Sequence, residues 1–194
     1  MTVIYILAII LQAWIIYYFI SKSRKKANQA ENKASVDLST YDGVRDAALN
    51  VSPADLKLNI PASQVFVYGV VMDWDMSGTM LTLAAYITGA ANVYLSSGPG
   101  ITGGGKNPEV GELAVRFVSD AQDFLGRAIQ VPQAAYPTKG CVRFHLLTNQ
   151  GVYDAQELLI HIEDTTSPWL SLFIRGNNVI NEMKQGEIQV TENQ

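Results

Sequence analysis

The chain has little of the material from which disulfides and zinc sites are made. Its 194 residues include one cysteine, Cys141, and two histidines. A single cysteine cannot form an intramolecular disulfide, and a structural zinc site usually takes about four Cys or His ligands. We therefore expect no bound metal, no cofactor and no cross-link within the chain.

Charged side chains are missing from residues 3–20, which read VIYILAIILQAWIIYYFI. A helix of roughly 18–20 apolar residues just crosses a hydrocarbon layer about 30 Å thick. No basic residue precedes this run, and no small-x-small cleavage site follows it, as a cleaved signal peptide would require. We predict that residues 1–21 form a retained single-pass transmembrane anchor instead of a signal peptide or a buried core helix.

Basic residues follow the apolar run but do not precede it. Lys and Arg near one end of a membrane helix favour the cytoplasmic side, and aromatic residues gather at the membrane interface. The sequence therefore predicts an outward-facing N-terminus and a cytoplasmic C-terminal domain. The residues expected at the interface are Trp14, Tyr17, Tyr18, Lys22, Arg24, Lys25 and Lys26.

Basic side chains are scarce in the rest of the chain. Residues 22–34 hold five of the 14 Lys and Arg residues and one of the 18 acidic residues, which leaves nine basic and 17 acidic residues beyond them. That net charge of −8 repels nucleic-acid phosphates, so we exclude nucleic acid as a partner. Residues 22–39 form the predicted basic and polar linker.

The hydrophobic patterning of residues 40–185 predicts one soluble α+β domain, followed by a polar tail at 186–194. Runs of strands separated by single helices indicate helices packed on an antiparallel sheet of about five strands, in the order α-βββ-α-ββ-α. Two or three helices would cover this sheet. The expected helices lie at 41–49, 108–128 and from 168 onward, and the expected strands at 64–75, 79–87, 92–96, 141–147 and 152–162.

A glycine-rich segment, Gly100–Asn107, matches the phosphate-binding pattern G-x-x-x-x-G-K. It has Asn where nucleotide-binding loops carry a Ser or Thr that holds Mg²⁺, and its preceding strand is predicted to be antiparallel. Two interpretations remain open: a connector that needs glycine for its turns, or a weaker anion-binding nest. The residues of the nest would be Gly103, Gly104, Gly105 and Lys106.

Two groups of ionisable residues could carry chemistry, but neither forms a complete catalytic set. A hairpin turn at residues 149–150 would place His145 opposite Asp154, a pair that can orient an imidazole. No nucleophile accompanies it, because Cys141 lies about 13 Å along the strand. Asp73 and Asp75 share one strand face, either as a proton-sharing or metal-binding pair or as solvated residues at a strand end. We assign no catalytic residue.

Apolar residues cover more than one face of the last predicted helix at its start, namely Trp169, Leu170 and Phe173. Such a helix is either wedged into its own domain or meets a partner. Gln12, the one amide in the anchor, is either a tolerated polar residue or a hydrogen-bonding contact with another membrane helix.

These features predict a membrane-anchored interaction or scaffold module on the cytoplasmic face. It would assemble with itself or serve as an accessory subunit of a membrane complex. The alternative is a membrane-tethered ligand sensor, anion sensor or enzyme that uses the glycine-rich loop at 98–106.

Overall fold

Strand β1 is the central strand of the fold, with three strands of the sheet on either side of it. The structure, a computed structural model, describes residues 37–192. Within them, seven antiparallel strands form one sheet in the order β4-β3-β2-β1-β6-β7-β5. The strands are β1 (Val67–Asp75), β2 (Met80–Tyr86), β3 (Ala91–Leu95), β4 (Gly98–Ile101), β5 (Ile129–Val131), β6 (Cys141–Thr148) and β7 (Gly151–Leu158).

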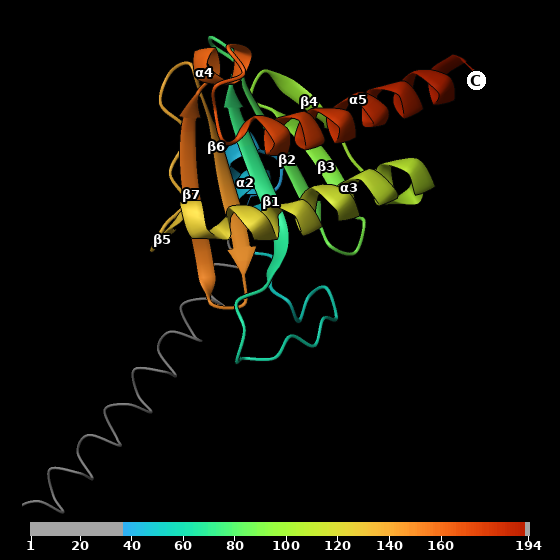
Figure 1. Ribbon diagram of the computed structural model, residues 1–194. Helices are drawn as coiled ribbons and strands as arrows, with labels where there is room; N and C mark the ends of the chain where they lie inside the picture. The colour runs from blue at the N-terminus through green and yellow to red at the C-terminus, as the bar shows by residue number, and fades with distance from the viewer. Residues whose placement is uncertain (1–36, 193–194) are drawn as a thin grey trace, which may run out of the picture. The chain divides into compact units, whose positions relative to one another are not determined.

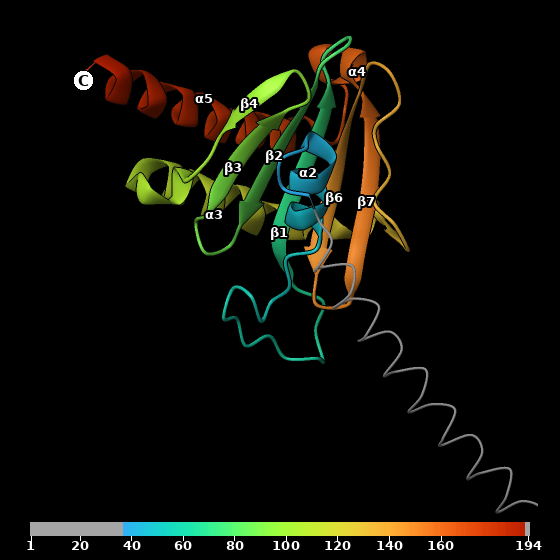
Figure 2. The same cartoon turned by 180° about the vertical axis from the view of Figure 1, so that it is seen from behind.

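Helices cover both faces of this sheet, so the predicted α+β class is confirmed. Helices α3 and α5 lie across one face (Figure 1), and α2 lies on the other (Figure 2). The described helices are α2 (Tyr41–Leu49), α3 (Pro108–Ala121), α4 (Leu159–Glu163) and α5 (Leu170–Glu192), with short 3₁₀ helices η1 (Gly104–Lys106) and η2 (Gln122–Arg127).

The two faces of β1 contribute to two different clusters of buried side chains. Val70 and Met72 pack with Phe117 in the cluster under α3 and α5. Val71 packs with Ala48 in a smaller cluster under α2. Because helices cover both faces, the strand reads as a continuous apolar run without a polar-apolar alternation.

Side-chain caps mark the starts of two helices, and Thr40 and Asn107 are the cap residues that the local sequence offers just before the expected helices at 41–49 and 108–128. The Thr40 side chain accepts a hydrogen bond from the amide of Gly43 at 3.1 Å, at the start of α2. The Asn107 side chain accepts from the amide of Glu109 at 2.9 Å, at the start of α3. Both side chains satisfy amides that have no partner within the helix, so these two helices begin where the local sequence places them.

The sheet has seven strands where the sequence predicted about five. Strand β4 forms inside the glycine-rich segment, where Gly100 lets the backbone approach β3 closely. Strand β5 has only three residues, too few to show a periodicity. The predicted strand 152–162 ends at Leu158, and α4 follows it directly. Helix α5 also runs on to Glu192, beyond the predicted start of the polar tail.

The predicted anchor lies outside the described residues, as do Gln12 and all the residues expected at the membrane interface. Residues 37–192 contain no helix with the length and apolar character needed to span a bilayer. The anchor, its orientation and the location of the domain remain predictions from the sequence.

The close approach of β4 to β3 predicts that Gly100→Ala destabilises the fold. A Cβ atom at Gly100 would lie 2.0 Å from the carbonyl oxygen of Val93, whereas one at Gly98 has no heavy atom within 4 Å. Overpacking of this kind typically costs about 1–3 kcal/mol. We expect Gly98→Ala, the control in the same strand, to change the free energy of unfolding by less than about 0.5 kcal/mol. Denaturant unfolding followed by tryptophan fluorescence measures both values, and equal stabilities would contradict this packing.

Candidate functional site

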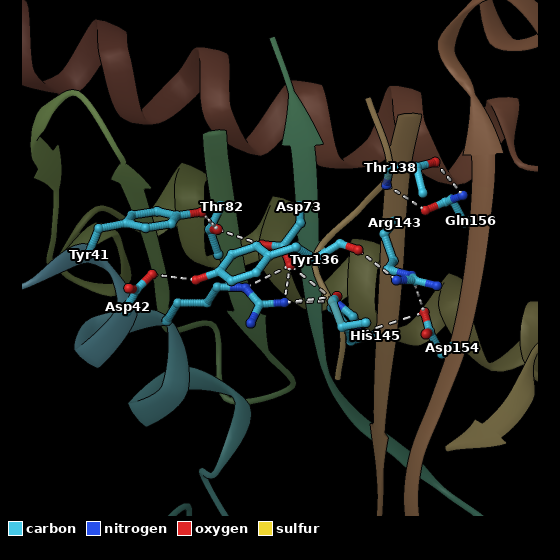
Figure 3. Close-up of polar contacts among 12 residues, drawn as sticks. Tyr41, Asp42, Asp73, Thr82, Tyr136, Thr138, Arg143, His145, Asp154 and Gln156 are labelled. Carbon is cyan, nitrogen blue, oxygen red and sulfur yellow. Dashed lines mark hydrogen bonds and ion pairs between the residues drawn. The ribbon is translucent and has the colours of Figure 1, made fainter. Parts of the chain in front are cut away.

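Three ionisable residues meet in the interior of the protein, on the α2 side of the sheet (Figure 3). Asp73 comes from β1, His145 from β6 and Arg45 from α2. Asp73 pairs with Arg143 in the β1–β6 register, so His145 is its diagonal neighbour on the same face. All three are almost fully buried, with 2% or less of each residue exposed. We call this set the Asp73 cluster.

The Asp73 carboxylate is the acceptor at the centre of this cluster. Arg45 donates to Oδ2 from Nε at 2.9 Å and from Nη2 at 2.6 Å. The Thr82 hydroxyl donates to Oδ1. Nε2 of His145 lies 3.0 Å from Oδ2, and because an ionised carboxylate only accepts, this nitrogen carries the proton. Both carboxylate oxygens are therefore satisfied by the protein itself.

Hydrogen bonds and charge decide the ionisation of this buried pair. Burial by itself would raise the pKa of Asp73, but the hydrogen bonds from His145 and Arg45 outweigh it and lower the pKa. Burial would lower the pKa of Arg45, but the hydrogen bond and charge of Asp73 raise it overall. Within the cluster, Asp73 and Arg45 therefore form an ion pair in which each residue keeps the other charged.

The segment between β5 and β6 closes the cluster on its outer side. The ring of Tyr136 lies over the guanidinium of Arg45 at 4.0 Å, and its hydroxyl donates to Asp42 at 2.6 Å. Arg45 also donates from Nη2 to the carbonyl of Ala135 at 3.1 Å. On the side of β2, the Tyr41 hydroxyl lies 2.7 Å from that of Thr82, and burial raises the pKa of Tyr41 to about 12. Behind these contacts the carboxylate of Asp73 is fully buried.

The predicted pairing of His145 with Asp154 is confirmed by the register of β6 and β7. Nδ1 of His145 lies 3.5 Å from Oδ1 of Asp154, and Nε of Arg143 lies 3.2 Å from the same oxygen. Neither contact is aligned as a hydrogen bond. The stronger partner of His145 is Asp73, which the sequence alone did not indicate because the two residues are 72 positions apart.

The two aspartates considered at the end of β1 have separate roles. Asp73 is held in the cluster, whereas Asp75 accepts a hydrogen bond from the amide of Gly140 at 2.7 Å. In residues 37–192, no group of three or more His, Cys, Asp or Glu side chains is arranged to hold a metal ion. Cys141 is buried, and its Sγ lies 3.2 Å from the Thr138 hydroxyl.

The residues of the predicted anion-binding nest lie together at η1, but several backbone amides of the loop already donate within the protein. The amide of Gly103 donates to Oδ1 of Asn92 at 3.0 Å. The amides of Lys106 and Asn107 donate to carbonyls of the same loop, each at 3.0 Å. A Cβ at Gly104 would come within 2.8 Å of Val110, so packing requires a glycine there. This geometry matches the connector interpretation of the loop.

The aromatic residues at the start of α5 pack into the domain. The ring of Trp169 lies 5.2 Å from that of Phe124 and 5.3 Å from that of Phe144, measured between centroids. Phe173 contacts Trp74 edge-on at 5.2 Å and is only partly exposed. Leu170 is also partly buried against the same core. These contacts match the alternative in which the helix is wedged into its own domain.

No protein-family model, curated protein or solved structure matches this chain.

The Asp73 cluster predicts a large loss of stability when one charge is removed. In Asp73→Ala the buried guanidinium of Arg45 loses its counter-ion, and breaking a buried pair in this way typically costs about 3–5 kcal/mol. Asp120→Ala is the matched control, because its pair with Arg175 at 2.8 Å is exposed and is expected to contribute about 0–1 kcal/mol. We expect the double variant Arg45→Met/Asp73→Leu to regain part of the loss in chemical unfolding. Equal losses for the two aspartate variants would contradict the role of burial.

The lowered pKa of Asp73 predicts a loss of stability in acid. Its pKa in the folded state is below the ordinary value of 3.8, so the unfolded chain binds this proton first as the pH falls. The stabilising contribution is complete above the unfolded pKa of about 3.9 and is lost as the pH falls through the folded pKa. Unfolding free energies measured from pH 6 down to pH 2 should fall less steeply in Asp73→Asn than in the unaltered protein. Parallel curves would contradict this contribution.

Proposed function

We propose that this protein is a non-catalytic interaction module that presents one edge of its sheet to a partner protein. The predicted N-terminal anchor would tether this module to the cytoplasmic face of a membrane. The partner would be a second copy of the chain or another membrane protein. The observation that carries the proposal is that strand pairing covers only part of the outer edge of β7.

Strand β5 covers only part of that edge. It pairs with β7 from Val152 to Asp154, whereas β6 pairs with β7 along its whole length. Among the strands that the structure describes, none pairs with the outer edge of β7 from Ala155 to Leu158. The contacts there come from side chains, since the Thr138 amide donates to the Gln156 side chain and the Leu158 amide donates to that of Glu157, each at 2.9 Å. Unpaired backbone groups at a sheet edge are a ready site for another chain to add a strand.

Exposed apolar side chains lie along the same edge. Ile129 of β5, Leu158 of β7 and Ile160 of α4 are 71%, 44% and 59% exposed, and we call these three residues the β7 edge patch. Ile129 pairs with Asp154, so it lies on the same sheet face as Leu158, about 13 Å along the strand. Apolar side chains combined with an unpaired strand edge are typical of a protein contact.

The Asp73 cluster supports a structural role for the α2 side of the sheet. Enzymes keep their reactive groups open to substrate, whereas Arg45 and Nε2 of His145 bond to Asp73 and, for Arg45, to the Ala135 carbonyl inside the protein. These bonds tie α2 and the Tyr136 segment to β1 and β6. Such bonds would keep the strands in fixed positions relative to one another, as a module that presents a sheet edge to a partner requires.

The proposal predicts that Ile129→Lys disrupts assembly in membranes. A lysine at this position puts a charge into the proposed contact, and charges on edge strands oppose edge-to-edge pairing. Crosslinking in native membranes followed by blue-native electrophoresis should show a complex that is lost in this variant. Ile174→Lys is the control, because Ile174 is 48% exposed on α5, a helix on the opposite face of the sheet.

The masses in the same experiment separate the two kinds of partner. A complex at an integer multiple of the mass of the chain indicates further copies of it, whereas any other mass indicates another membrane protein. A strictly monomeric protein, or complexes that survive Ile129→Lys unchanged, would contradict the proposal.

A further inference from the structure

An apolar pocket of about 340 Å³ lies where α5 crosses the end of the sheet formed by β2, β3 and β4. The pocket lies near the β4 edge of the sheet, whereas the β7 edge patch lies near the β5 edge, and β4 and β5 are the two outermost strands. The pocket therefore belongs neither to the Asp73 cluster nor to the proposed protein contact. The residues that line it are Met76, Thr79, Leu81, Val93, Leu95, Gly100, Ile101 and Lys184.

The pocket has a buried inner part and a more exposed rim. Leu81 and Val93 are buried in adjacent strands, and they pack in the main core. Gly100 adds no side chain to the lining, since a Cβ there would collide with the backbone of β3. Met76 is exposed at the turn between β1 and β2. The depth of the pocket thus follows from the packing of the strands.

One lining residue carries a charge. Lys184 is exposed on α5, one position after the buried residue Met183. It has no hydrogen-bond or ion-pair partner among the side chains that the structure describes. Thr79 is the one other lining residue with a polar side chain. An apolar interior beside an unpaired cation complements a ligand with an apolar body and an anionic end.

We propose that this pocket binds a single-chain amphiphile with an anionic head group, with the chain against Leu81, Val93 and Ile101 and the head group at Lys184. Ligand pockets usually measure roughly 300–1,000 Å³, and a volume near the lower limit suits one alkyl chain better than two. A second copy of this protein would need a surface of roughly 800 Å² on each partner, which a small concave pocket does not provide. Fatty carboxylates and lysophospholipids share the required chemistry.

The test uses the full chain in native membranes and a photoreactive palmitate that carries a diazirine in its alkyl chain. After illumination, mass spectrometry should find the label on peptides that contain Met76 or Ile101. Excess unlabelled palmitate should displace the label, and palmityl alcohol, which has the same chain without the charge, should be about fivefold less effective. Lysophosphatidate added in a parallel arm distinguishes a lipid-derived ligand from a free fatty acid, since the better competitor identifies the source.

Two variants, each with a matched control elsewhere in the domain, test whether the label depends on this pocket. Lys184→Met removes the charge but keeps the alkyl stem, so palmitate and palmityl alcohol should then compete equally. Lys139→Met, at an exposed lysine just before β6, should leave the fivefold preference unchanged. Ile101→Trp fills the pocket and should abolish the displaceable label, whereas Ile160→Trp in α4 should not.

Three results would overturn the inference: label that excess palmitate does not displace, label confined to residues 1–36, or an unchanged preference in Lys184→Met. Lys184→Met alters one exposed side chain, so this arm stands even if Ile101→Trp fails to fold. The masses of the protein complexes do not enter any of these readouts, so failure here and failure of the proposed sheet-edge contact remain distinguishable.

Discussion

The carboxylate of Asp73 is the constraint on which the α2 side of the structure depends. It sits on the central strand of the sheet with none of its surface exposed, and an ionised carboxylate without partners is very costly in such a place. Arg45 supplies the opposite charge, while Thr82 and His145 supply further donors. Each donor comes from a different element, so satisfying one carboxylate fixes α2, β2 and β6 relative to β1.

The same arrangement encloses a histidine–aspartate pair inside the domain. The geometry that would orient an imidazole for base catalysis is present, but Tyr136 and the segment around it cover the guanidinium that completes the cluster. Both oxygens of Asp73 accept hydrogen bonds within the cluster, whereas Nδ1 of His145 lies 3.5 Å from Asp154 without forming an aligned hydrogen bond. The proposed protein contact and the apolar pocket lie outside this cluster, at opposite ends of one sheet.

Much of the fold could be predicted wherever the signal was local. Thr40 and Asn107 mark the starts of α2 and α3 because a cap acts on amides two or three residues away. The β6–β7 register followed from one tight turn, which correctly paired His145 with Asp154. Strand β4 was missed because glycine signals a turn in the sequence, yet at Gly100 it permits two backbones to approach. Strand β5 is too short for any pattern.

The sequence by itself determined the class of the fold, the caps of two helices and the register of one hairpin, because each depends on residues close together in the chain. Only the tertiary structure decided that Asp73 would meet Arg45, 28 positions away, and His145, 72 positions away. It also decided that Trp169 would face the core instead of a partner. Contacts of this kind depend on which strands pair and which helix covers which face. No local pattern carries that information, since the sheet must form before such side chains are neighbours.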